Sequence, residues 1–148
     1  MAFLFADAGL ARKLEAAEAA GGLAMVEALC ARHGPDAAAA EPVAGGAAVY
    51  CGPHSDLTRI YGAGVAERLT DADLDRAEAF FQAHGANPAM DVCPFVDPSL
   101  GERLVSRGYR PVEYSTALSC LLEPNDSRPL LEPCPDREPW ARVLMQGV

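Results

Sequence analysis

The amino-acid sequence predicts an α/β fold in which helices pack on a mixed β-sheet. The chain has 148 residues, half of them hydrophobic, which is enough for one domain with a real core. Its apolar patterns predict elements in the order helix, strand, strand, helix, strand, helix, strand. The first two strands can pair as a hairpin, whereas the later ones follow helices, and this combination indicates a mixed sheet.

A long helix and a loop are predicted first. Residues 7–33 carry apolar side chains at three- to four-residue spacing, as on one face of a helix. Gly21 and Gly22 weaken its middle by about 1 kcal/mol each, which indicates a kink or a break there. Gly34 and the proline after it end the helix. The following "PDAAAAEPVAGG" is predicted to be a loop because of its proline and glycine content.

The hairpin comes next. Residues 47–52 and 57–66 are predicted strands, and residues 53–56, "PHSD", are the turn between them. Gly62 and Gly64 within the second strand indicate a bulge or a close approach of backbone.

The next helix is predicted over residues 70–85. Thr70 is a favourable N-cap, and acidic residues in the first turn complement the helix dipole. Its buried stripe is Leu74, Ala77 and Phe81.

Three further segments complete the predicted order. Residues 89–95 are a third strand. Residues 97–108 are a short helix with Asp97 as N-cap, Pro98 in the first turn and Gly108 just past its end. Residues 111–122 are a long final strand, and the proline-rich residues 123–148 are predicted to be a linker or the start of a further unit.

Composition excludes several classes of function. The net charge is −9 and Lys13 is the only lysine, so the sequence predicts no nucleic-acid surface. No apolar run reaches the 18 residues of a spanning helix, so no membrane role is predicted. The five cysteines include no CxxC pair, which argues against a disulfide framework or a structural zinc and fits a reducing cytoplasm.

The candidate catalytic residues favour structural interpretations. His33 and His84 each precede a glycine at the C-terminal end of a predicted helix, where the helix dipole favours an imidazole as a cap. His54 lies between a proline and a serine in the predicted turn, too close in sequence to Ser55 and Asp56 for a triad. Cys93 has no evident activating base and is predicted to be a core cysteine.

The acidic and aromatic candidates are interpreted in the same way. The acidic residues of the helix from Thr70 lack EF-hand spacing, so we predict a solvated helix face and no metal site. These residues are Asp71, Asp73, Asp75 and Glu78. Glu113 and Tyr114 alternate on the final strand, so one of them faces outward toward a cleft or a dimer partner, although a structural role is favoured for both.

Five segments in order resemble the N-terminal half of bacterial tandem proteins of the GNAT-type N-acetyltransferase superfamily. They read "LARKLEAAEA", "SDLTRIYGAGV", "TDADLDRAEAFFQAHG", "DVCPFVDPSL" and "ERLVSRGYRPVEY". The resemblance covers residues 7–122 and implies a GNAT-like domain over residues 1–122, with a mainly antiparallel mixed sheet. It also implies a second GNAT-like unit or a homodimer as partner, acetyl-CoA as the cofactor of the family and a small-molecule amine as acceptor.

The resemblance further implies where acetyl-CoA would bind. Residues 57–66 would lie along the pantetheine arm, residues 89–95 would splay from them, and the helix from Thr70 would face the pyrophosphate. A retained site would therefore lie near Gly64, Val65, Ala66, Arg68 and Thr70.

This chain departs from the family at the residues that matter most. Its pyrophosphate stretch, "AERLTDADLD", contains no glycine and offers three aspartates, which would repel a pyrophosphate, and Arg68 compensates only in part. Leu104 occupies the position where the family often has a tyrosine acid, and Tyr109 occupies a packing position. We therefore expect a degenerate unit that binds no cofactor.

Three functions stay open at this point. The first is the non-binding N-terminal unit of an N-acetyltransferase, either as a fragment of a longer chain or as a stand-alone remnant. The second is a non-catalytic dimerisation or ligand-sensing module. The third is an active unit that binds acetyl-CoA through an atypical loop.

Overall fold

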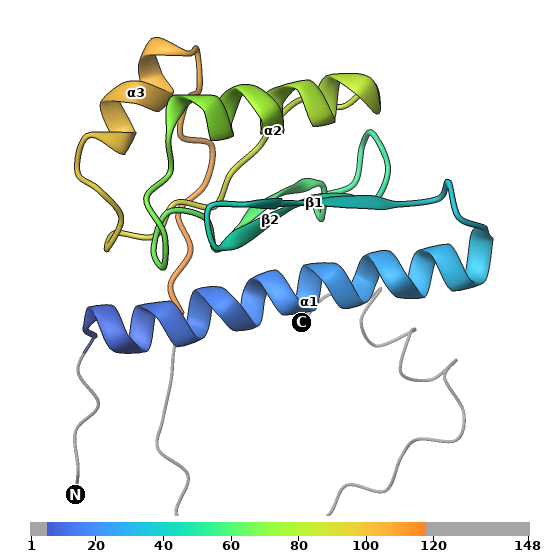
Figure 1. The fold of residues 1–148 in the computed structure, drawn as a ribbon, viewed down its shortest axis with the longest axis horizontal. Coiled ribbons are helices and arrows are strands. Elements are labelled where there is room, and N and C mark those ends of the chain that lie inside the picture. Colours follow the sequence, from blue (N-terminus) through green and yellow to red (C-terminus); the bar gives the residue numbers. More distant parts are fainter. Residues whose placement is uncertain (1–5, 118–148) are drawn as a thin grey trace, which may run out of the picture. The chain divides into compact units, whose positions relative to one another are not determined.

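The computed structural model describes residues 6–117 and has a mixed α/β fold. The described residues up to Thr116 belong to one compact unit. Its elements follow the order α1 (Ala8–His33), β1 (Ala39–Val43), β2 (Gly46–Tyr50), β3 (Arg59–Tyr61), α2 (Asp71–Ala83) and α3 (Leu100–Ser106). Within this unit α1 covers one face of the sheet, and α2 and α3 lie over the other (Figure 1).

Helix α1 confirms the first prediction, except that it has no break at Gly21 and Gly22. The Asp7 carboxylate caps its start by accepting from the Leu10 amide at 2.7 Å. A Cβ on Gly22 would lie 3.1 Å from the side chains of Tyr61 and Val49, so this glycine lets the helix approach the sheet closely.

Strand β1 corrects the predicted loop after α1. It pairs antiparallel with β2, with Ala39 opposite Tyr50 and Val43 opposite Gly46. Ala44 and Gly45, at the hairpin tip, both have positive φ, as a two-residue type I′ turn requires. Because β1 pairs only with β2 in the described sheet, its proline occupies an edge, where a missing N–H is tolerated.

Strand β3 is shorter than the predicted residues 57–66. It pairs antiparallel with β2, which confirms the hairpin, and it ends before Gly62, whose φ is +69°. A Cβ on Gly62 would lie 2.6 Å from the Glu15 carbonyl oxygen, so the predicted close backbone approach is confirmed. The turn over residues 53–56 is also present.

The predicted third strand, residues 89–95, is reduced to one parallel bridge. Met90 lies opposite Ile60, the Ile60 amide donates to the Ala89 carbonyl at 2.8 Å, and the Asp91 amide donates to the Ile60 carbonyl at 3.0 Å. The prediction of a strand was wrong beyond this bridge. Both strand pairs of the described sheet are antiparallel, so the predicted mixed sheet is not formed beyond this isolated parallel bridge.

Helix α3 begins later than predicted. The Asp97 carboxylate accepts from the Ser99 amide at 2.9 Å and from its hydroxyl at 2.8 Å, so it closes a turn ahead of the helix. Ser99, not Asp97, is the N-cap, and Pro98 lies outside the helix. Gly108, with φ of +91°, follows the C-cap as predicted.

The predicted final strand is not formed over residues 111–117, and its remainder lies outside the described residues, as does the predicted linker.

Two apolar clusters stabilise the unit, one on each face of the sheet. Alternation along β2 sends Ala47 and Val49 toward α1 and Ala48 toward α2. The predicted stripe of α2 is confirmed, because its three residues are fully buried: Leu74, Ala77 and Phe81.

Candidate functional site

The start of α2 is the place where the family resemblance implies a pyrophosphate site, and its own residues cap it. The Asp73 amide donates to the Thr70 hydroxyl oxygen at 3.2 Å. The Asp73 carboxylate in turn accepts from the Thr70 hydroxyl at 2.6 Å and from the Thr70 amide at 2.9 Å. This reciprocal pair is a capping box, and its hydrogen bonds from Thr70 lower the pKa of Asp73.

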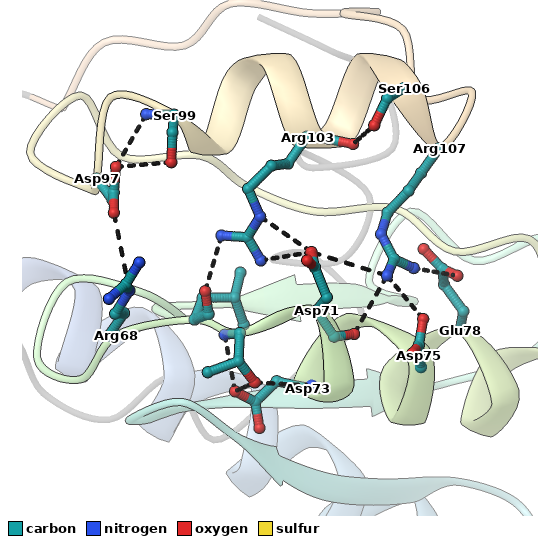
Figure 2. Close-up of polar contacts among 12 residues, drawn as sticks. Arg68, Asp71, Asp73, Asp75, Glu78, Asp97, Ser99, Arg103, Ser106 and Arg107 are labelled. Atoms are coloured by element: carbon teal, nitrogen blue, oxygen red, sulfur yellow. Dashed lines mark hydrogen bonds and ion pairs between the residues drawn. The ribbon is translucent and has the colours of Figure 1, made fainter.

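Arg103 of α3 and Arg107, the C-cap of that helix, reach across to the same helix start (Figure 2). Arg103 donates to one Asp71 carboxylate oxygen from Nε at 3.0 Å and from Nη2 at 2.8 Å, and its Nη1 donates to the Leu69 carbonyl at 2.9 Å. The guanidinium therefore binds both the carboxylate of the first helical residue and the backbone just before the helix.

Arg107, one turn further along α3, binds the next turns of α2. Its Nη2 donates to the Asp75 carboxylate at 2.7 Å and to the Asp71 carbonyl at 3.2 Å, while its Nη1 donates to Glu78 at 3.0 Å. We call Asp71, Asp75, Glu78, Arg103 and Arg107 the α2–α3 ion-pair cluster. Two of its carboxylates, those of Asp71 and Asp75, are still 67% exposed.

The α2–α3 ion-pair cluster corrects the prediction of a merely solvated acidic face. The acidic residues at positions 71, 75 and 78 hold α3 against α2, and Asp73 caps the helix. Sequence reasoning missed the two arginines. Their signal was the spacing of four between Arg103 and Arg107, which matches carboxylates repeating every three or four residues on the facing helix.

The five residues expected near a retained cofactor site lie on the loop from β3 to α2 and at its end. The Gly64 amide donates to the Ala44 carbonyl at 3.1 Å, so the hairpin tip already uses this N–H, which belongs to the segment implied to lie along the pantetheine arm. Val65 and Ala66 follow in the turn. Arg68 is 80% exposed, and its Nε lies 4.0 Å from an Asp97 carboxylate oxygen (Figure 2). Thr70 is engaged in the capping box.

The histidines occupy the structural positions expected for them. His84 follows the last residue of α2, and its Nδ1 lies 2.8 Å from the Phe80 carbonyl oxygen, which confirms a capping role. Its ring also contacts those of Tyr50 and Phe80, with centroids 4.7 and 4.6 Å away. His33 is the last residue of α1, and His54 lies in the turn after β2.

Cys93 is buried, as predicted. Burial raises the pKa of its thiol, and the nearby Glu15 raises it further. The pKa of Glu15 is itself raised, chiefly by burial. An activated cysteine needs the opposite shift, since the thiolate is the reactive form.

Tyr109 and Leu104 contact the α2 side of the unit. Leu104 is buried in the core, and Tyr109 packs against the same cluster, as its predicted packing role requires. Within the described part, the Tyr109 hydroxyl and Glu78 Oε1 are both buried without a hydrogen-bond partner. Burial, reinforced by the Glu78 carboxylate, raises the pKa of Tyr109 to about 12, so this phenol stays protonated at neutral pH.

A hollow of about 200 Å³ adjoins this tyrosine. It is lined by Pro88, Arg107, Gly108 and Tyr109. The guanidinium of Arg107 is already bound to two carboxylates, so the hollow offers no free cation for an anionic ligand.

Residues 6–117 contain no group of three or more side chains placed to hold a metal ion, and none of their helices is both long and apolar enough to cross a membrane. Glu113 and Tyr114 are both exposed on the segment after α3.

No protein-family model, curated protein or solved structure matches the chain.

Proposed function

We propose that this chain is a GNAT-like unit that supports an N-acetyltransferase without binding acetyl-CoA itself. The proposal takes its family from the five sequence segments that resemble the tandem GNAT group. The arrangement around β3 supports it, because the resemblance implies that residues 89–95 neighbour residues 57–66 and splay from them. Ile60 and Met90 do lie opposite one another, in parallel, after the crossover through α2.

The proposed lack of a cofactor site rests on a single observation, the structure of the α2 start. A helix N-terminus binds a pyrophosphate through free amides and its positive dipole end. Here the capping box uses two of the groups at that end, and three aspartates occupy the first five positions of the helix. A pyrophosphate would have to displace these contacts and approach carboxylates, two of which remain largely exposed.

The arginines do not reverse this conclusion. Arg103 and Arg107 lie close enough to attract phosphate, but each already donates to carboxylates and to backbone carbonyls. Recruiting them would unpair the α2–α3 ion-pair cluster, including Glu78, whose side chain is only 22% exposed. The cost of stranding a mostly buried carboxylate therefore opposes cofactor binding.

In this proposal the chemistry occurs on a second GNAT-like unit. The overall reaction is acetyl transfer from acetyl-CoA to an amine by direct attack in a ternary complex, and this unit shapes the substrate cleft or holds the catalytic unit. The segment after α3 is consistent with a partner, since Val112 is 96% exposed and Tyr114 90% exposed. Burial of such side chains against another unit is favourable.

A thermal-shift titration of the chain with acetyl-CoA tests the proposal, with coenzyme A as a second ligand. Specific binding at 100-fold excess over Kd stabilises by about 2.7 kcal/mol, which is several degrees or more for a domain of this size. We expect no saturable shift at millimolar cofactor. A saturable shift with both ligands would contradict the proposal.

A homodimeric module without any acetyltransferase role is the second candidate, favoured by the same closed α2 start and exposed segment. Sedimentation velocity of the chain alone distinguishes the two. A stable dimer favours the module, and a monomer favours a unit that awaits a different partner.

A further inference from the structure

Two cysteines lie at the ends of two facing rows of side chains. On α1, the row that faces the sheet contains Ala19, Gly22 and Val26, and a further step of four residues leads to Cys30. On β2, the row that faces α1 contains Ala47 and Val49, and the next step of two leads to Cys51. Cys51 and Val26 both pack against this cluster.

Extending the hairpin register by one residue places Cys51 opposite a residue that Cys30 contacts. Ala39 pairs with Tyr50, so one further step places Ala38 opposite Cys51. The Cys30 thiol lies 3.3 Å from the Ala38 carbonyl oxygen and 3.5 Å from that of Pro35. Cys30 thus contacts the residue that faces Cys51.

The charge environment agrees with this placement. Burial raises the pKa of Cys51, and the nearby Cys30 raises it further, so the two thiols are neighbours but the Cys51 thiolate is scarcer and its exchange slower. Both cysteines are free and partly exposed, so a small oxidant can reach them. Cys93 lies elsewhere: it neighbours Glu15, which is about 22 Å from Cys30 along α1 at 1.5 Å per residue.

We propose that Cys30 and Cys51 are a redox pair that closes to a reversible disulfide and ties the end of α1 to the end of β2. Oxidised glutathione is the class of oxidant. One cysteine thiolate attacks a glutathione sulfur, forms a mixed disulfide and expels one glutathione thiolate. The second cysteine thiolate then attacks the protein sulfur of that mixed disulfide and expels the second. Two protons and two electrons leave the protein, and two glutathione molecules are formed.

The experiment equilibrates the purified chain in glutathione redox buffers, traps free thiols by acid and alkylation, and maps disulfides after trypsin. Cleavage at Lys13, Arg32 and Arg59 separates the two cysteines into the peptides 14–32 and 33–59. The three other cysteines fall in other peptides, so the cross-link is unambiguous. The same equilibration is repeated on the chain unfolded in urea.

The expected result is a cross-link between peptides 14–32 and 33–59 whose equilibrium constant is at least roughly tenfold larger in the folded chain than in urea. Cys30→Ser and Cys51→Ser should each abolish it, and the matched control Cys93→Ser should retain it. An equal or smaller equilibrium constant in the folded chain would overturn the proposal. So would a disulfide of Cys30 or Cys51 that forms in the folded chain chiefly with one of the three other cysteines.

Discussion

Arg107 offers the sharpest test of the α2–α3 ion-pair cluster. Replacing it with alanine removes three hydrogen bonds at once, to Asp75, to Glu78 and to the Asp71 carbonyl. Arg107 is the C-cap of α3, so the substitution leaves the helical residues Leu100–Ser106 unchanged. The change in the free energy of unfolding therefore reports the contacts between the two helices.

The structure sets the expected magnitude. The partner carboxylate of Asp75 is 67% exposed, and such a pair contributes about 0–1 kcal/mol. Glu78 is only 22% exposed, and a stranded, mostly buried carboxylate costs about 1–3 kcal/mol. We therefore expect Arg107→Ala to lower the free energy of unfolding by about 2 kcal/mol.

Urea denaturation measures this loss, and an unchanged dependence of the free energy of unfolding on urea concentration shows that the two variants unfold in the same way. The matched control is Arg76→Ala on α2, because Arg76 is 55% exposed and its partner Asp73, although only 17% exposed, keeps its two hydrogen bonds from Thr70 when the arginine is removed. It should stay close to the wild-type stability. If Arg107→Ala is no more destabilising than Arg76→Ala, the argument that the cluster holds α3 in place is refuted.

Two further perturbations have equally direct readouts. Gly21→Ala should raise the free energy of unfolding by about 1 kcal/mol, because a Cβ at this position meets no other atom within 4 Å. A Cβ on Gly22 would lie 3.1 Å from Tyr61 and Val49, so Gly22→Ala should be less stable than Gly21→Ala by at least about 1 kcal/mol. Equal midpoints of the two variants in urea would contradict this. Burial raises the pKa of Tyr109 from 10.0 to about 12, so its neutral form favours the folded state, and this stability is present below pH 10 and lost as pH rises toward about 12. Tyr109→Phe should remove that alkaline loss and the last tyrosinate absorbance step, and an unchanged profile would count against it.

The helices were predictable because their signals are local. The spacing of apolar residues gave the extent of α1 and the buried stripe of α2, and Thr70 marked the start of α2. Strand β1 was missed because alanines and a proline read as loop, and its pairing with β2 overrides that composition. The strands predicted over residues 57–66 and 89–95 were too long. Glycines with positive φ end the pairing of the first segment early, and the second segment keeps a single bridge.

For the candidate site, the sequence predicts only features that disfavour an anion, and the absence of a cofactor site stays a prediction. The sequence contains no glycine at the expected pyrophosphate loop and carries aspartates instead, so its weakness as an anion site could be argued in advance. That Arg103 and Arg107 bind those aspartates depends on how α3 packs across α2, more than 25 residues away in the chain. No local pattern determines that packing.

The central claim is that the start of α2 is closed to acetyl-CoA. The most direct measurement is an NMR titration of the isotope-labelled chain with acetyl-CoA that follows the backbone amides of Asp71, Ala72 and Asp73. The account predicts that these amides show no saturable shift at millimolar cofactor, because the capping box and the aspartates occupy the anion position. A saturable shift centred on these three amides would contradict it and would identify the unit as a cofactor-binding one.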